Sequence, residues 1–173
     1  MHSKTNCPKY LTSVEKDRGK VTIEEYMDKV HFKHILFTEQ YKLFFKDEFL
    51  KVIAITEFIK YYHNVNVVHF DGLLDEFSRD TIDRLIFPLK PELIVEPKSD
   101  CNYSVVHEAD TIANKLFRGY CKKSDVDVKK YMDTLIMPDL NFYFKNMNNL
   151  SLLTNLDSKF AVQKALASNQ SYR

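Results

Sequence analysis

The sequence predicts an all-helical fold, a single bundle of about eight or nine helices. Apolar side chains recur every three or four residues over most of the chain, which is the period of a helix buried along one face. The 173 residues include three glycines, whereas a large β protein needs many more for its turns. The stretch 65–70 has β-like composition, but it is short and we identify no partner strand, so we interpret it as a connector.

Composition excludes several classes of protein. Hydrophobic residues make up 45% of the chain and charged residues 28%, which is typical of a globular domain that buries its own core. The formal net charge of +1 predicts no nucleic-acid partner, because nucleic-acid binding relies on a strongly positive surface. Gly19, Gly72 and Gly119 are too widely spaced for a phosphate-binding loop, and we predict no cofactor.

Cysteine usage and the N-terminal segment indicate a cytoplasmic protein. Cys7, Cys101 and Cys121 are an odd number at long spacings, which is typical of reduced thiols. The first residues are polar and lack the apolar centre of a secretory signal. No apolar run is long enough to cross a membrane.

The helical pattern begins with a clear N-terminal signal. Thr22 and Glu25 have the spacing of a capping box, in which each side chain accepts a hydrogen bond from the other residue's backbone amide. A second short helix or turn is expected at 32–37. The predicted domains are a polar lead-in at 1–16, an all-helical domain at 17–156, and a C-terminal helix with a frayed tail at 157–173.

The densest apolar pattern lies between residues 39 and 87. Leu43–Phe45 predict a short helix that ends near Asp47–Glu48, and a long core helix is expected at 50–63. Another helical pattern covers 72–87. The prolines that follow, Pro88, Pro91 and Pro97, then indicate an extended loop.

The second half of the chain predicts three or more further helices. Ser104 is expected to cap a helix with one apolar stripe, and Ser124 with Asp127 to open a helix at 125–136. Pro138 is expected at the start of a short aromatic helix, and a weaker, Ala-rich helix is expected at 157–167. The stripe after Ser104 consists of Val105, Ala109, Ile112, Leu116 and Tyr120, widened by Ala113 and Phe117.

Several segments share their order and spacing with a known family. They are DRGKVTIEEYM at 17–27, the short helix LFFKDE at 43–48 with the long helix that follows it to IKYY at 59–62, the helix end and PELIV at 82–95, and DLNFYFKN with a leucine pair at 139–153. Taken together they resemble the regulator of G-protein signalling (RGS) homology domain, most closely the version in G-protein-coupled receptor kinases. The resemblance implies an all-helical fold that binds the switch regions of a Gα subunit and accelerates GTP hydrolysis in trans.

The sequence departs from this family at its expected contact residues. Phe49–Val52 stand where the family has a Glu-Asn pair, Ile94 near its loop asparagine, and Phe142 near its closing arginine. Phenylalanine cannot make the forked contacts of arginine, so the resemblance implies partner binding in which GTPase acceleration is lost. The expected partner-binding residues are Asp47, Glu48, Lys51, Glu92, Ile94, Asp139, Asn141, Phe142 and Lys145.

Catalysis by the chain's own residues is not predicted. His31 and His34 could share a helix face, but zinc would need two further ligands, so we predict no metal site. Cys121 could pair with His63 or His107 as a nucleophile, but a buried structural thiol is the favoured interpretation.

One basic cluster could contact anionic membrane lipids or an acidic partner. An ordinary charged face is the favoured alternative, because Asp125 and Asp127 interrupt the cluster. Its members are Lys115, Arg118, Lys122, Lys123, Lys129 and Lys130.

Three hypotheses about function remain open. The first is an RGS-type domain that binds Gα or a related signalling protein. The second is a scaffold or adaptor on the same fold with another partner. The third is an unrelated helical-bundle interaction protein, such as a virus-type regulator of death or immunity with a helix-binding groove. All three act by binding another protein.

Overall fold

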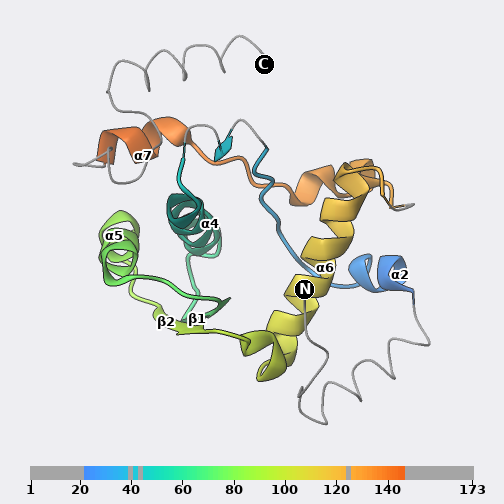
Figure 1. Ribbon diagram of the computed structural model, residues 1–173, viewed down its shortest axis with the longest axis horizontal. Helices are drawn as coiled ribbons and strands as arrows, with labels where there is room; N and C mark the ends of the chain where they lie inside the picture. The colour runs from blue at the N-terminus through green and yellow to red at the C-terminus, as the bar shows by residue number, and fades with distance from the viewer. Residues whose placement is uncertain (1–21, 39–40, 43–44, 124–125, 147–173) are drawn as a thin grey trace. The chain divides into compact units, whose positions relative to one another are not determined.

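The computed structural model describes residues 22–38, 41–42, 45–123 and 126–146, and within them the fold is mixed α/β (Figure 1). The prediction of an all-helical bundle is therefore wrong. The elements are α2 (Ile23–Met27), α4 (Asp47–Tyr61), β1 (Val67–Asp71), α5 (Glu76–Ile86), β2 (Glu92–Glu96), the 3-10 helix η1 (Ser99–Cys101), α6 (Ser104–Tyr120), the 3-10 helix η2 (Val128–Thr134) and α7 (Leu140–Asn146).

The chain divides into two compact units, and it passes between them several times. Unit 1 contains α2, both strands, η1, α6 and η2. Unit 2 contains α4, α5 and α7. Unit 1 comprises the chain up to His34 together with Val67–Leu73 and Glu92–Leu135, and unit 2 comprises Ile35–Asn66, Leu74–Pro91 and the chain from Ile136 onward.

The two strands correct the interpretation of 65–70 as a connector. β1 and β2 pair in parallel, from Val67 opposite Glu92 to Asp71 opposite Glu96. A parallel pair needs a long crossover, here the segment that contains α5, so the partner strand is distant in sequence. The extended loop predicted from Pro88, Pro91 and Pro97 is likewise wrong at 92–96, where β2 lies. The flanking prolines lie just outside β2, where the missing amide removes no hydrogen bond from the ladder.

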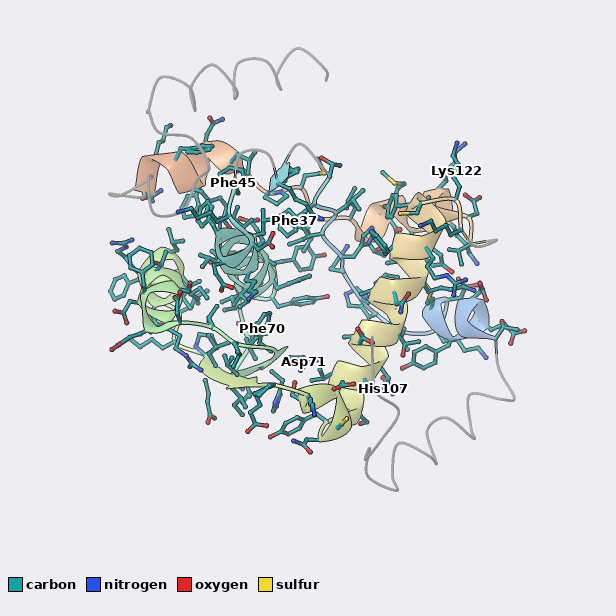
Figure 2. All side chains as sticks on the ribbon, in the orientation of Figure 1. Phe37, Phe45, Phe70, Asp71, His107 and Lys122 are labelled. Atoms are coloured by element: carbon teal, nitrogen blue, oxygen red, sulfur yellow. The ribbon has the colours of Figure 1, made fainter. Side chains whose placement is uncertain are left out.

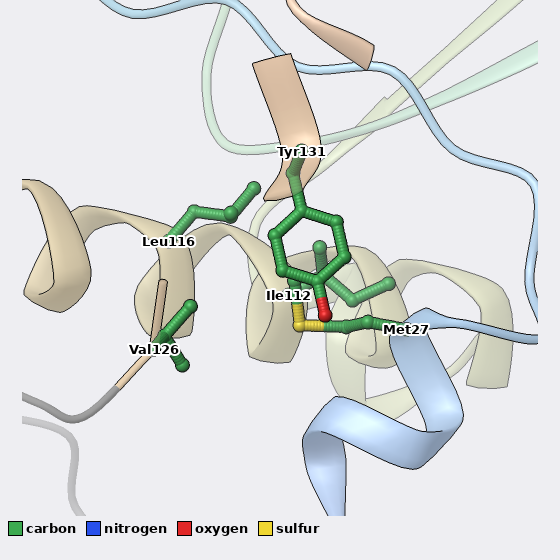
Figure 3. Close-up of a cluster of buried hydrophobic side chains, with 5 residues drawn as sticks. All are labelled: Met27, Ile112, Leu116, Val126 and Tyr131. Carbon is green, nitrogen blue, oxygen red and sulfur yellow. The ribbon is translucent and has the colours of Figure 1, made fainter. Parts of the chain in front are cut away.

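The core of unit 1 forms around α6. Ile112 and Leu116 on this helix pack with Met27, Val126 and Tyr131 (Figure 3), all at most 7% exposed. Tyr26, Val30, Phe32, Tyr120 and Val128 pack around this cluster.

The N-terminus of α2 confirms the predicted capping box. The Glu25 amide donates to Thr22 Oγ1 at 3.2 Å, and the Thr22 amide donates to Glu25 Oε2 at 3.1 Å. The short helix or turn predicted at 32–37 is wrong, because this segment is extended and His34 forms an isolated parallel bridge with Leu135.

Two details of the second half differ from the prediction. Ser104 is the first residue of α6 and not its cap, which is Tyr103. The helix predicted at 125–136 is the shorter 3-10 helix η2, where Asp127 Oδ1 accepts from the Lys129 amide at 3.1 Å. Ser124 lies outside the described residues.

Unit 2 is built on the long core helix that the sequence predicts. This helix, α4, begins at Asp47, so Asp47 and Glu48 form its first turn and do not end an earlier helix. Carboxylates at this end are favourable because of the helix dipole. α5 begins after Asp75, whose Oδ1 accepts from the Ser78 amide at 2.6 Å, and it packs on α4.

The short aromatic helix α7 is also confirmed, and it packs on α4. The Phe144 ring stacks on Phe45 at 5.4 Å between centroids, and the Tyr143 ring meets Phe49 edge-on at 6.0 Å. Pro138 is buried two residues before α7 and is not its first residue. The predicted segments 1–16 and 157–167 lie outside the described residues, as do Leu43, Phe44 and Met147.

Candidate protein-binding surface

The expected partner-binding residues of α4 lie at its start. Asp47 and Glu48 are exposed, and Lys51 Nζ lies 2.7 Å from Glu48 Oε1. This ion pair is local to one helix turn and partly exposed, so its stabilising effect is small. These three side chains form a solvated charged patch.

The expected residues of α7 are divided between surface and packing. Asp139, Asn141 and Lys145 are exposed, and Asp139 Oδ1 accepts from the Asn141 amide at 3.0 Å. Phe142 is half-buried, and Lys60 Nζ lies 3.8 Å from the centre of its ring. This cation–π contact holds the Phe142 ring within unit 2.

We expected Glu92 and Ile94 in a loop, but both are residues of β2. Glu92 is exposed at the start of the strand, and the half-buried Ile94 is paired with His69 of β1. Both belong to unit 1, whereas the other seven expected residues belong to unit 2.

A buried polar pair holds α7 against α4. The Tyr143 hydroxyl donates to Glu57 Oε1 at 2.6 Å and approaches the Ile53 carbonyl oxygen at 3.3 Å. Burial, with the Glu57 carboxylate beside it, raises the pKa of Tyr143 strongly. Lys60 Nζ lies 3.3 Å from the same Glu57 oxygen. A fully buried, protonated tyrosine with its donor satisfied indicates a structural role.

The histidine and cysteine candidates have ordinary structural environments. His31 and His34 lie outside any helix, and the two ring nitrogens of His34 lie 2.9 Å from Thr134 Oγ1 and 3.0 Å from the Tyr120 hydroxyl. Burial lowers the pKa of His34. Among the described residues, no three or more His, Cys, Asp or Glu side chains are grouped to hold a metal ion. Cys121 is exposed, so its expected burial is wrong.

Part of the basic cluster is neutralised within unit 1. Lys115 Nζ lies 2.9 Å from Glu24 Oε1, and Lys130 pairs with Asp28. Lys130 and the Tyr131 hydroxyl together hold the pKa of Asp28 below its usual value. Arg118 and Lys122 are exposed at the C-terminal end of α6, where Figure 2 labels Lys122.

α6 also carries a second apolar stripe that the sequence analysis placed in the core. Val105 and Phe117 are each 61% exposed, and Ala109 and Ala113 between them are exposed as well. We call these four residues the outer stripe. They are spaced four apart, so each lies next to the following one on the surface of the helix. The buried residues Val106, Ile112 and Leu116 alternate with them around the helix, because positions two or three whole turns apart point in nearly the same direction.

The periodicity of α6 explains why the outer stripe was missed. Apolar residues at steps of three and of four residues all fit one broad face of a helix, so their spacing does not distinguish the buried positions from the exposed ones. Contiguous exposed apolar side chains are typical of a binding surface, whereas scattered ones are not informative. The outer stripe is therefore the candidate site.

Comparisons with protein-family models, with curated proteins and with solved structures found no match. None of the described helices has both the length and the apolar character that crossing a membrane requires.

Proposed function

We propose that the chain is a protein-binding module and that the outer stripe of α6 is its binding surface. The observation that carries this proposal is the exposure of Val105 and Phe117 on α6, whose other apolar residues Val106, Ile112 and Leu116 are already buried within unit 1. Burying such a side chain contributes about 1.5–3 kcal/mol, so a partner that covers the stripe gains affinity from it. Ala109 and Ala113 would let the backbone of a partner helix approach closely.

A quantitative capture experiment tests this surface. The tagged chain is expressed in cells, and bound proteins are compared for wild type, Phe117→Ser and Phe77→Ser. Phe77 is an exposed phenylalanine on α5 and serves as the matched control. We expect specific partners to be lost with Phe117→Ser and retained with Phe77→Ser. Equal retention by both variants contradicts the proposal.

A Gα subunit is the second candidate partner. In its support, two segments that carry the RGS resemblance, α4 and α7, pack together through Phe49, Tyr143 and Glu57. Binding to Gα and single-turnover GTP hydrolysis are measured side by side on a panel of subunits. We expect binding without acceleration of GTP hydrolysis, because Ile94 and Phe142 replace the asparagine and the arginine with which the family contacts Gα. Absence of binding to every subunit removes this candidate.

We further propose a cytoplasmic location with peripheral contact at the inner membrane face. The residues involved are Lys115, Arg118, Lys122 and Lys123, of which the last three are exposed. Attraction to anionic lipid weakens with salt. Sedimentation with anionic vesicles should therefore fall as salt rises and should be weaker for Lys122→Glu. Binding that is equal on neutral vesicles contradicts this contact.

A further inference from the structure

We infer that His34 is a proton-operated hydrogen-bond switch: the neutral ring holds the Tyr120 hydroxyl, and the protonated ring turns that hydroxyl toward Met132. The contacts that carry this inference all lie within unit 1. The switch is independent of the binding proposed for the outer stripe.

The neighbours of the ring determine which nitrogen carries the proton of neutral His34. Thr134 has a single hydroxyl proton, which it donates to the Tyr131 carbonyl oxygen at 2.9 Å. Thr134 Oγ1 therefore accepts a hydrogen bond from His34 Nδ1, which lies 2.9 Å away. Nε2 of the neutral ring then has no proton, and it accepts from the Tyr120 hydroxyl at 3.0 Å.

The opposite arrangement of protons is weaker. In it, Thr134 would donate to Nδ1 and lose its bond to the Tyr131 carbonyl oxygen, and Nε2 would donate to Tyr120. The Tyr120 proton would then go to Met132 Sδ, 3.9 Å away. A thioether sulfur is a much weaker acceptor than a carbonyl oxygen, so the form with the proton on Nδ1 is favoured.

Protonation of His34 changes one of these contacts and leaves the other as it is. Nδ1 still donates to Thr134, but Nε2 now carries a proton as well and can only donate. The Tyr120 oxygen accepts from Nε2, and the Tyr120 hydroxyl proton turns to Met132 Sδ. Because Tyr120 ends α6 and Met132 lies in η2, the charge of His34 decides whether these two elements are joined by this hydrogen bond.

Two ionisable groups lie next to the ring. Burial and then the positive charge of Lys33 lower the pKa of His34, so the neutral ring prevails near pH 7. Lys33 Nζ donates to the Asp133 carbonyl oxygen at 2.9 Å. Burial raises the pKa of Tyr120, so its hydroxyl keeps its proton in both states of the switch.

The charged groups of η2 are engaged elsewhere or exposed. Lys130 pairs with Asp28, and the Tyr131 hydroxyl donates to the same carboxylate at 3.1 Å. The other charged side chains of η2, Lys129 and Asp133, are exposed. Within the part of unit 1 that the structure describes, the ring nitrogens of His34 thus contact hydroxyl groups and no charged side chain.

The switch lies where the chain leaves unit 1 in two places. His34 and Leu135 pair in an isolated parallel bridge, and each is the last residue of its segment before the chain enters unit 2. The His34 amide also donates to the Thr134 carbonyl oxygen at 3.0 Å. A change in the ring therefore acts on both connecting segments at once.

Nitrogen NMR of the full chain with isotope-labelled histidine tests the neutral state. At about pH 8 a histidine is neutral, and the chemical shifts of its two ring nitrogens show which of them is protonated. The signals of His34 are those lost in His34→Gln. We expect the proton on Nδ1 of His34 and a mixture of both forms for the exposed control His63. A proton on Nε2 of neutral His34 overturns the inference.

Met132→Leu tests the protonated state. This change removes the sulfur that accepts only when His34 is protonated, so it should lower the pKa of His34 and leave the neutral spectrum unchanged. Met137→Leu removes another exposed methionine sulfur and should alter neither. The measurement is a titration of the His34 nitrogens from about pH 8 to about pH 5. An equal pKa of His34 in the two variants overturns the turn of Tyr120 toward Met132.

Thr134→Val tests what selects the neutral form. Valine keeps the shape of the side chain but removes the oxygen that accepts from Nδ1, so the proton should move to Nε2 already at about pH 8. A proton that stays on Nδ1 in this variant overturns the role of Thr134. Met132→Leu lies at an exposed position and keeps the inference testable if Thr134→Val does not fold.

Discussion

Gly119 lies where η2 approaches α6. A Cβ added to this residue would lie 2.6 Å from Val128 Cγ1, which is shorter than any normal contact. The absence of a side chain at Gly119 therefore permits close packing of the two elements. The backbone does not itself require a glycine here, because Gly119 lies within α6.

Gly119→Ala should lower the free energy of unfolding by about 1–3 kcal/mol, because the added methyl group forces η2 away from α6. Chemical denaturation measures this change. Asn114→Ala, an exposed position of the same helix, is the control and should change stability by less than about 0.5 kcal/mol. Equal stability of wild type and Gly119→Ala would mean that η2 adjusts without cost.

His34 joins three segments of unit 1 through its backbone and both ring nitrogens. Its amide donates to the Thr134 carbonyl oxygen at 3.0 Å, and its ring contacts the Thr134 and Tyr120 hydroxyls. Burial lowers the pKa of His34 below the usual 6.5, so the folded protein resists protonation of this ring more than the unfolded chain does.

Acid should therefore weaken unit 1 through His34. Below pH 6.5, the pKa of a histidine in the unfolded chain, the unfolded chain binds more protons at His34 than the folded one. The contribution of His34 to the free energy of unfolding is therefore fully present above this pH and decreases as the pH falls. Thermal unfolding of wild type and His34→Gln is compared between pH 7.5 and 5.5, roughly one unit on either side of a normal histidine pKa. We expect a flatter pH dependence for His34→Gln. The same slope in both proteins would exclude His34 as a source of acid sensitivity.

At the scale of elements, the attachment of α7 to α4 depends on a polar contact within an aromatic cluster. Tyr143 is fully buried among these rings, and its hydroxyl donates to Glu57. Removing the hydroxyl leaves a buried carboxylate with one donor fewer, whereas the ring contacts with Phe49 and Phe142 remain.

Tyr143→Phe should cost about 1–3 kcal/mol of stability, because an unsatisfied buried acceptor carries a desolvation penalty. Denaturation monitored by hydrogen exchange should localise the loss to α4 and α7. Tyr103→Phe removes a hydroxyl from a half-exposed ring in unit 1 and should leave α4 and α7 unaffected. A neutral result for Tyr143→Phe would show that Lys60 alone satisfies Glu57.

At the scale of the whole molecule, adjacent apolar residues of α6 have different consequences for folding. Leu116 is 2% exposed in the core of unit 1, whereas the adjacent Phe117 is 61% exposed. Leu116→Ser should lower stability by about 2–5 kcal/mol, and Phe117→Ser by less than about 0.5 kcal/mol. Urea denaturation of the two variants measures the contrast. Similar losses for both would place Phe117 in the core and remove the outer stripe as a surface.

Local patterns predicted a substantial part of the structure. Thr22 and Glu25 form the expected capping box, α5 lies within the expected helical region, and α7 is the expected aromatic helix. α4 covers most of the helix expected at 50–63 but begins earlier, at Asp47. Each of these depends on residues close together in sequence. Hydrogen bonds and apolar spacing within one or two turns are sufficient to specify them.

The sequence by itself therefore determined the capping box of α2 and the approximate positions of α4, α5, α6 and α7. Tertiary structure decided the rest. β1 becomes a strand because β2, on the far side of α5, supplies its parallel hydrogen bonds, and no local signal reveals such a distant partner. Likewise, Leu116 is buried and Phe117 exposed because the other elements of unit 1 cover one side of α6, a choice that apolar periodicity alone leaves undecided.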